Sequence, residues 1–224
     1  MLLVNTFTSR PMTVRISDST VRRLSLYLRM LRDLREQGVK LVSSRELAHR
    51  ARATSAQVRK DLSVFGSFGK RGRGYEVEAL TGTLEGILGL SGVWRVALVG
   101  VGKIGTALLG YRDLARRGFE VVAAFDVAED KVGREVSGIT VSDFEDLESI
   151  IEERAIDIAI VATPREVAAS VAERLAEAGV RAILNFAPTE LQEIDRVPVR
   201  TVDVVLELEG LSYLLHRPLR EGAI

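Results

Sequence analysis

The sequence predicts two domains of different fold class: an N-terminal winged helix-turn-helix domain and, after it, an α/β domain built on a doubly wound parallel sheet. Two short helical patterns with capping signals follow a longer amphipathic one in the first 80 residues, and strand and helix patterns then alternate along the chain. The charge divides in the same way. Residues 1–80 carry 16 Lys and Arg against 7 Asp and Glu, whereas residues 81–224 carry 15 against 24.

The composition is that of a globular protein of 224 residues, with 46% hydrophobic and 28% charged residues. No apolar run approaches the roughly 20 residues of a membrane-spanning helix, and the opening MLLVNTF is too short for a signal sequence. The absence of cysteine excludes disulfides, thiolate zinc sites and iron–sulfur clusters. We therefore expect a cytoplasmic protein with no membrane partner.

The basic segment begins with an amphipathic helix over residues 19–37, whose apolar side chains recur at helical spacing. Two capping boxes follow. Ser43 with Glu46 opens a short helix over SRELAHRA, and Thr54 with Gln57 opens a third helix over TSAQVRKDLSVF. Two short helices that are joined by a turn and packed on a longer one predict a helix-turn-helix.

The third helix carries side chains that can read a DNA groove, because amide, guanidinium, ammonium and hydroxyl groups bond to base edges and phosphates. The following segment, GSFGKRGRGYEV, predicts a wing whose basic tip suits a narrow minor groove, with a solvated loop as the alternative. We assign residues 1–80 to a winged helix-turn-helix domain that binds double-stranded DNA. Its candidate contact residues are Gln57, Arg59, Lys60, Ser63, Lys70, Arg71 and Arg73.

A second domain is expected after a linker helix over residues 81–93, which two glycines weaken. The segment WRVALVGVGKIGTALLGY predicts a buried strand, a GxGxxG motif and a helix, and a second strand, EVVAAFD, ends at Asp126 about 20 residues past the motif. A strand before the motif, a helix after it and an acidic residue at this distance are typical of a Rossmann domain. We assign this domain to residues 94–205.

The chemistry of the motif predicts binding of NAD or NADH. Gly100 permits the tight turn, Gly102 lets the backbone approach the pyrophosphate, and Gly105 allows close packing of helix on strand. Asp126 would accept hydrogen bonds from the ribose and repel a 2′-phosphate. Later strand ends add further candidates, for which loop packing is the alternative. The candidate cofactor-binding residues are Gly100, Val101, Gly102, Lys103, Ile104, Gly105, Asp126, Thr163, Pro164, Asn185, Phe186 and Ala187.

The rest of the chain continues the alternation of strands and helices. IDIAIVAT and RAILNFA are apolar strands of the kind that a parallel sheet buries, and Thr163 is expected to cap a helix that begins at Pro164. VRTVDVVLEL is expected to form the last strand. A final apolar stretch, LEGLSYLLHRPL, follows.

No catalytic apparatus is visible in the sequence, and we predict neither a catalytic residue nor a metal site. The two assigned domains leave no room for a substrate domain, and no tyrosine is followed four residues later by lysine. A DNA-binding domain joined to a dinucleotide-binding domain indicates a non-enzymatic transcription factor that responds to the state of its cofactor. Two alternatives remain open: a regulator that reads another adenine nucleotide or a coenzyme A derivative, and an NAD-dependent oxidoreductase.

Several segments resemble, in order, the Rex family of NADH-sensing transcriptional repressors: SSRELAHRA, AQVRKDLSVFGSFGKRGRGYEV, LVGVGKIGTAL, VVAAFD and AILNFAP. The resemblance implies a homodimer that binds a palindromic operator when NADH is low and leaves it when NADH binds. It also implies a C-terminal helix, assigned to residues 206–224, that swaps onto the partner subunit, and it implies that Tyr111 and Asp203 belong to the redox switch. The chain departs from the family pattern at Thr163, where the family commonly has valine.

Overall fold

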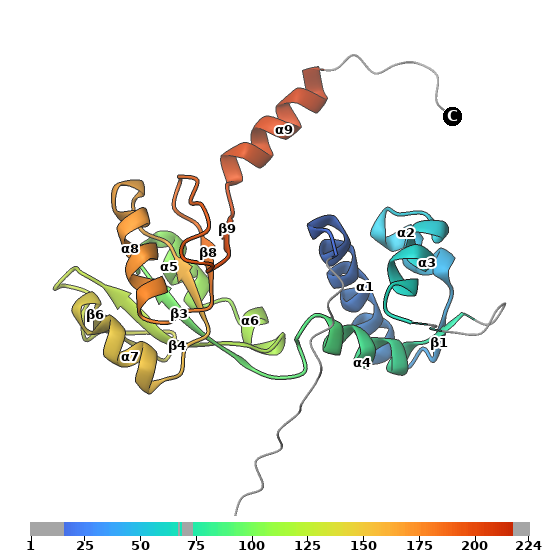
Figure 1. Cartoon of the computed structure of the whole chain (residues 1–224), viewed down its shortest axis with the longest axis horizontal. Coiled ribbons are helices and arrows are strands. Elements are labelled where there is room, and N and C mark those ends of the chain that lie inside the picture. The colour runs from blue at the N-terminus through green and yellow to red at the C-terminus, as the bar shows by residue number, and fades with distance from the viewer. Residues whose placement is uncertain (1–15, 67, 69–73, 217–224) are drawn as a thin grey trace, which may run out of the picture. The chain divides into compact units, whose positions relative to one another are not determined.

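The computed structural model describes residues 16–66, 68 and 74–216. The chain divides into two compact units, 1–91 and 92–224 (Figure 1). Each unit has its own hydrophobic core. No helix in the described part of the chain is long and apolar enough to cross a membrane.

The first unit is a helical domain with a small antiparallel sheet. The apolar face of α1 supplies the fully buried side chains of Leu24, Tyr27 and Leu31, which pack against Leu47 and Leu62 of the two short helices. This packing explains why two short amphipathic helices are stable here, since isolated helices of this length are marginal in water. The elements are α1 (Asp18–Glu36), β1 (Leu41–Val42), α2 (Ser44–Ala51), α3 (Ser55–Ser63), β2 (Tyr75–Glu76) and α4 (Val77–Ile87).

Capping sets the start of both short helices. At α2 the capping box is complete, because Ser43 Oγ accepts from the Glu46 N–H and Glu46 Oε2 accepts from the Ser43 N–H. At α3, Thr54 Oγ1 accepts from the Gln57 N–H, but the Gln57 side chain bonds to Asp61 one turn later. The prediction of a second complete capping box was therefore wrong, because the Gln57 amide that would have completed it is bound to the buried Asp61 carboxylate.

The helix expected as a linker over residues 81–93 begins earlier and is part of the first core. It starts at Val77 and ends at Ile87, and the side chains of Leu80 and Leu84 are buried against α1 and its neighbours. Burial of one face explains why a helix with two internal glycines is retained, because tertiary packing outweighs the weak helical propensity of glycine.

The predicted wing lies only partly among the described residues. Strand β2 pairs with β1 in antiparallel register, with Val42 opposite Tyr75. The basic tip, with Lys70, Arg71 and Arg73, lies outside the described residues.

The second unit is built on a seven-stranded sheet in the order β5-β6-β4-β3-β7-β8-β9. All neighbouring pairs are parallel except β5 with β6 at one edge. Numbered along the chain, the parallel strands stand in the Rossmann order 3-2-1-4-5-6, which reverses between β3 and β7. The strands are β3 (Trp94–Val99), β4 (Phe119–Asp126), β5 (Glu135–Val136), β6 (Ile139–Asp143), β7 (Ile158–Val161), β8 (Ala182–Asn185) and β9 (Val199–Thr201).

Helices cover both faces of this sheet (Figure 1). Successive side chains of β3 point to opposite faces, so Ala97 and Val99 join the core under α7 and α8, while Val96 and Leu98 join the core under α5. This arrangement confirms the predicted doubly wound α/β class. The helices are α5 (Lys103–Leu109), α6 (Asp113–Arg116), the 3-10 turn η1 (Phe144–Asp146), α7 (Leu147–Glu153), α8 (Arg165–Glu177) and α9 (Val204–His216).

The last strand is shorter than the sequence predicts. We expected VRTVDVVLEL to be extended throughout, but β9 ends at Thr201 and α9 begins at Val204. Asp203 makes this switch, because its Oδ1 accepts from the backbone N–H groups of Val205 at 2.8 Å and Leu206 at 3.2 Å, as an N-cap residue does. An apolar run alone does not distinguish a strand from a helix.

Candidate functional site

The glycine-rich loop between β3 and α5 has two glycines that the fold requires and one that faces open space. Gly100 has φ +95°, and a Cβ on it would lie 2.6 Å from the Ala162 carbonyl oxygen. A Cβ on Gly105 would overlap the carbonyl oxygen of Gly100. Around Gly102, by contrast, no described atom lies within 4 Å of such a Cβ. Gly102 is therefore the point at which a ligand can approach the backbone.

The residues between these glycines differ in exposure. Val101 is buried, whereas Lys103 and Ile104 are exposed at the start of α5. The Lys103 ammonium therefore adds a positive charge at the edge of the loop, where it would attract a phosphate group.

Asp126 ends β4 beside this loop and is already hydrogen bonded on both oxygens. Its Oδ2 accepts from the Val101 N–H and from Lys131 Nζ, each at 2.8 Å, and its Oδ1 accepts from the Ala128 N–H at 3.0 Å. Burial would raise the pKa of Asp126, but the hydrogen bonds from Lys131, Ala128 and Val101 hold it below its ordinary value. The carboxylate therefore stays ionised and tied to the glycine-rich loop.

Lys131 is a residue that sequence reasoning missed. A turn returns the chain toward the end of β4, with the Lys131 N–H donating to the Ala128 carbonyl oxygen, and this turn brings the ammonium group to Asp126. The only signal in the sequence was a lysine five positions after the acidic residue. The Lys131 ammonium donates to an Asp126 oxygen that could otherwise accept from the ribose hydroxyls. A nucleotide must therefore either displace this ammonium or donate to Asp126 beside it.

Thr163 lies at the end of β7, where the strand order of the sheet reverses. The prediction that it caps the next helix was wrong: α8 begins at Arg165 after Pro164, and no side chain caps it. The Thr163 hydroxyl is buried and has no hydrogen-bond partner among the described residues. An unpartnered buried hydroxyl costs about 1–3 kcal/mol, which a bound ligand can recover.

The loop after β8 holds the other predicted pocket residues. Asn185 is fully buried, and its amide bonds to the main chain of Ala187 and Thr189, so this side chain shapes the loop. Phe186 is half-buried and packs against the core on the α5 face of the sheet. Gly102, the Asp126 carboxylate and the Thr163 hydroxyl all lie at the carboxyl ends of strands, and together they fit a dinucleotide.

The face of α3 that was predicted to contact DNA is polar and basic. Arg59, Lys60 and Ser63 are exposed, and Arg59 Nη1 donates to Ser44 Oγ at the start of α2 at 3.2 Å. The Ser63 hydroxyl donates to the Lys60 carbonyl oxygen of its own helix. The structure thus brings Arg59 to the first turn of α2, while the Lys60 ammonium is left at the surface of α3.

Gln57, the remaining predicted DNA contact in the described part of α3, is half-buried. Its side-chain Nε2 donates to Asp61 Oδ1 at 2.7 Å. Asp61 was not predicted as a site residue, because two of its three donor residues, Arg23 and Tyr27, belong to α1, 38 and 34 positions away in the sequence.

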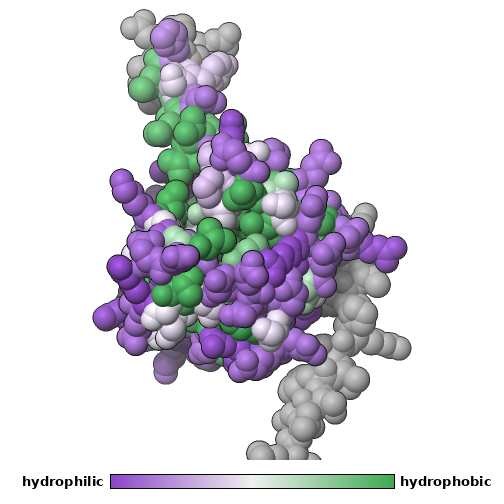
Figure 2. All heavy atoms as spheres, turned by 90° about the vertical axis from the view of Figure 1, so that its left-hand side faces the viewer, coloured by the Kyte–Doolittle hydropathy of each residue, from purple (hydrophilic) through white to green (hydrophobic). Residues whose placement is uncertain are grey.

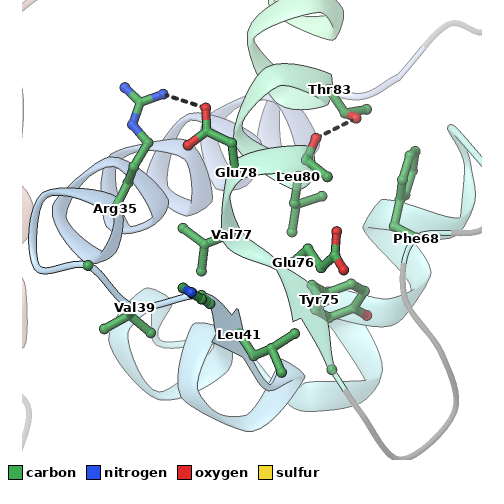
Figure 3. A pocket seen from close by; sticks show the side chains of 14 residues that line it. Arg35, Val39, Leu41, Phe68, Tyr75, Glu76, Val77, Glu78, Leu80 and Thr83 are labelled. Carbon is green, nitrogen blue, oxygen red and sulfur yellow. Dashed lines mark hydrogen bonds and ion pairs between the residues drawn. The ribbon is translucent and has the colours of Figure 1, made fainter.

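A cavity of about 950 Å³ lies elsewhere in the first unit, between the end of α1, the small sheet and α4 (Figure 3). An ion pair between Arg35 and Glu78, 3.6 Å apart, stands at its edge. Among the described residues, none of the predicted DNA-binding or cofactor residues lines this cavity.

The C-terminal helix α9 has no buried residue. Figure 2 shows its apolar side chains along the outside of the helix. Tyr111, which follows the first Rossmann helix, is also 55% exposed. An exposed apolar surface of this kind is typical of an interaction site. The exposed apolar residues of α9 are Val204, Val205, Leu206, Leu208, Leu211, Tyr213, Leu214 and Leu215.

The fold and the two sites define a DNA-binding regulator with a dinucleotide-binding domain. Over 89% of its length the chain is 48% identical to the redox-sensing transcriptional repressor Rex of Chloroflexus aurantiacus, of which it covers 94%. Over 93% of its length it is 46% identical to the same repressor of Streptomyces avermitilis, of which it covers 82%. The chain belongs to the Rex family of redox-sensing transcriptional repressors.

Family models and solved structures agree with this assignment. A model described as a putative DNA-binding protein N-terminus matches residues 15–63, and one described as a CoA binding domain matches residues 92–189. RSP, a Rex-family repressor, in complex with β-NAD⁺ and operator DNA is 37% identical, with a TM-score of 0.85, covering 90% of this chain and 93% of that one. RSP with β-NADH is 35% identical, with a TM-score of 0.81, covering 90% and 95%. The predicted family and fold class are confirmed.

Proposed function

We propose that this chain is a redox-sensing repressor that binds operator DNA when NADH is scarce and leaves it when NADH binds. The observation that carries this proposal is its likeness to RSP, whose structures hold β-NAD⁺ with operator DNA in one case and β-NADH in another. The basic face of α3 and the open glycine-rich loop supply a site for each ligand on one chain. Its relatives are named repressors, and we propose that it has no catalytic activity and acts in the cytoplasm.

We propose specific roles for three of the cofactor residues. The Gly102 backbone admits the pyrophosphate, Asp126 accepts from the adenosine ribose, and the Thr163 hydroxyl bonds to the ligand at the reversal point of the sheet. The ionised Asp126 opposes a 2′-phosphate, which favours NAD and NADH over their phosphorylated forms.

A homodimer is the proposed assembly. The apolar residues of α9 are between 55% and 87% exposed in the single chain, and swapping the helix onto a second copy would bury them. A two-fold dimer presents two copies of α3, which suits a palindromic operator.

The coupling between the two ligands follows from linkage. If NADH favours a dimer geometry that no longer fits two successive half-sites, operator DNA must weaken NADH binding by the same factor. NAD⁺ differs from NADH in the charge and planarity of the nicotinamide ring, so the discriminating groups must lie near that ring.

Titration of a fluorescently labelled palindromic operator tests the proposal. We expect NADH to release the protein at concentrations at which NAD⁺ has no effect, measured by anisotropy at fixed salt. Coenzyme A serves as the competitor, because the second unit matches a CoA-binding model. Operator binding that neither NADH nor NAD⁺ changes would support DNA binding by this chain and contradict redox sensing. Release by coenzyme A alone would assign a different ligand.

Tyr111 and Asp203 are the proposed redox-switch residues. We expect Tyr111→Phe and Asp203→Asn each to lower the ratio of NADH to NAD⁺ affinity roughly tenfold, as the loss of one charge-assisted hydrogen bond does. NADH fluorescence titration with NAD⁺ competition measures this ratio. Asparagine can still cap the N-terminus of α9 as Asp203 does, whereas alanine would remove this cap in addition to the carboxylate. An unchanged ratio in both variants contradicts the assignment.

A further inference from the structure

The recognition helix α3 carries a buried carboxylate with an unusually complete set of donors. Asp61 is 3% exposed and accepts from Arg23 Nε at 2.7 Å, Arg23 Nη2 at 2.8 Å, Tyr27 Oη at 3.0 Å and Gln57 Nε2 at 2.7 Å. Arg23 and Tyr27 belong to α1, so the carboxylate fastens the recognition helix to α1. A buried charge is tolerated when it is paired and hydrogen bonded in this way.

The protonation state of Asp61 fixes the orientation of the Gln57 amide. Burial would raise the pKa of Asp61, but the hydrogen bonds from Arg23, Gln57 and Tyr27 hold it below its ordinary value. An ionised carboxylate can only accept hydrogen bonds. The Gln57 atom that lies 2.7 Å from it must therefore be the NH₂ nitrogen, and the amide oxygen occupies the other position.

This orientation matters because of where Gln57 lies. It is in the first turn of α3 and half-exposed, and the first turn is the part of a recognition helix whose side chains contact base edges. A free glutamine rotates its amide to suit either a donor or an acceptor. An amide held by a buried carboxylate cannot rotate without losing a charge-assisted hydrogen bond.

We propose that Asp61 is a positioning residue for operator recognition: it holds the Gln57 amide oxygen toward the groove and so makes Gln57 select a base that carries an amino group. In the major groove, adenine N6 and cytosine N4 donate, whereas guanine O6 and N7 and thymine O4 only accept. The Gln57 oxygen accepts from the first two and is repelled by the others. This inference rests on the proposed function, because it concerns the same interface with DNA.

The pairing with Arg23 makes the arrangement compatible with DNA. Arg23 forms a two-point ion pair with Asp61 and also donates to Thr20 Oγ1 at 3.1 Å. The carboxylate therefore adds no unbalanced negative charge next to the phosphates.

The test is a base-preference profile, measured by competition with operators in which each base pair of the half-site is substituted in turn. We expect one position at which wild-type protein prefers the amino-bearing base by roughly tenfold, the usual cost of one mismatched base pair. Gln57→Met and Asp61→Asn should each abolish that preference and leave the other positions and the salt dependence unchanged. Asparagine presents either an oxygen or an NH₂ group to Gln57, so the amide is free to rotate.

Three controls separate positioning from stability. Leu84→Ala removes a fully buried side chain of the same core and should lower stability without altering the profile. Tyr27→Phe removes one donor to Asp61 but leaves its bond to Gln57, and should also keep the profile. If Asp61→Asn does not fold, the double variant Arg23→Gln with Asp61→Asn removes both charges together.

Two results overturn the proposal. Either Asp61 variants weaken binding to every operator by one common factor and keep the profile, or Gln57→Met keeps the preference at every position. Absence of operator binding by wild-type protein would instead reject the proposed function itself, which the same titration shows first.

Discussion

Replacing Gly105 with alanine is expected to weaken NADH binding strongly and to destabilise the second unit. The added Cβ would overlap the Gly100 carbonyl oxygen and lie 3.1 Å from Leu98 Cδ2, and the backbone oxygen cannot move without deforming the loop. We expect the unfolding free energy to fall by about 1–3 kcal/mol, as for other overpacked sites. Because α5 must then shift away from β3, we expect NADH affinity to fall on the order of 100-fold. Chemical denaturation and NADH fluorescence titration measure the two effects.

Gly102→Ala is the matched control for this prediction. Gly102 has φ −82°, which alanine adopts readily, and no described atom lies near the new Cβ. Stability should therefore be unchanged, while NADH affinity falls because the methyl group takes the place of the pyrophosphate. If Gly102→Ala binds NADH as tightly as wild type, the pyrophosphate does not pass this glycine.

Replacing Leu208 and Leu211 together with aspartate is expected to convert the proposed dimer into a monomer. Both side chains lie on one stripe of α9 and are exposed in the single chain, so the fold of each protomer should tolerate the change. In a dimer that covers this stripe, each aspartate would be buried without a partner. A buried unpaired charge costs about 3–5 kcal/mol, which weakens dimerisation on the order of 1,000-fold. Sedimentation velocity distinguishes the two states.

Glu209→Gln on the same helix controls for the change of composition, since it removes a charge from a position outside that stripe and should leave a dimer. The monomeric double variant should also bind a palindromic operator far more weakly, because only one α3 engages per molecule. A double variant that stays dimeric would show that α9 does not form the interface.

The parts of this protein that could be predicted from its sequence are those that local physics decides. The Ser43–Glu46 capping box works over three residues, and the glycine motif depends on backbone conformations that only a residue without Cβ adopts easily. The alternation of apolar strands and amphipathic helices likewise specifies the sheet class, because the periods of strands and helices differ. Family membership followed from such segments and was confirmed by the relatives.

The contacts that complete the sites were decided by the tertiary structure alone. Arg23 pairs with Asp61, which lies 38 positions away in the sequence, and Asp61 also accepts a hydrogen bond from the Gln57 amide. Gln57 is therefore held by Asp61 and does not complete the capping box that the sequence predicts. The Lys131 ammonium is brought to Asp126 by a turn, and the Thr163 hydroxyl loses its expected capping role and stays without a partner among the described residues.

The sequence by itself therefore determined the class of each domain, the glycine loop and the basic helix α3. Only the tertiary structure decided which polar side chains are already bound to one another and which remain for a ligand. The physical reason is that capping, periodicity and turn conformation act within a few residues. Hydrogen-bond partners of buried groups depend instead on which faces of distant elements pack together, as α1 packs against α3 around Asp61.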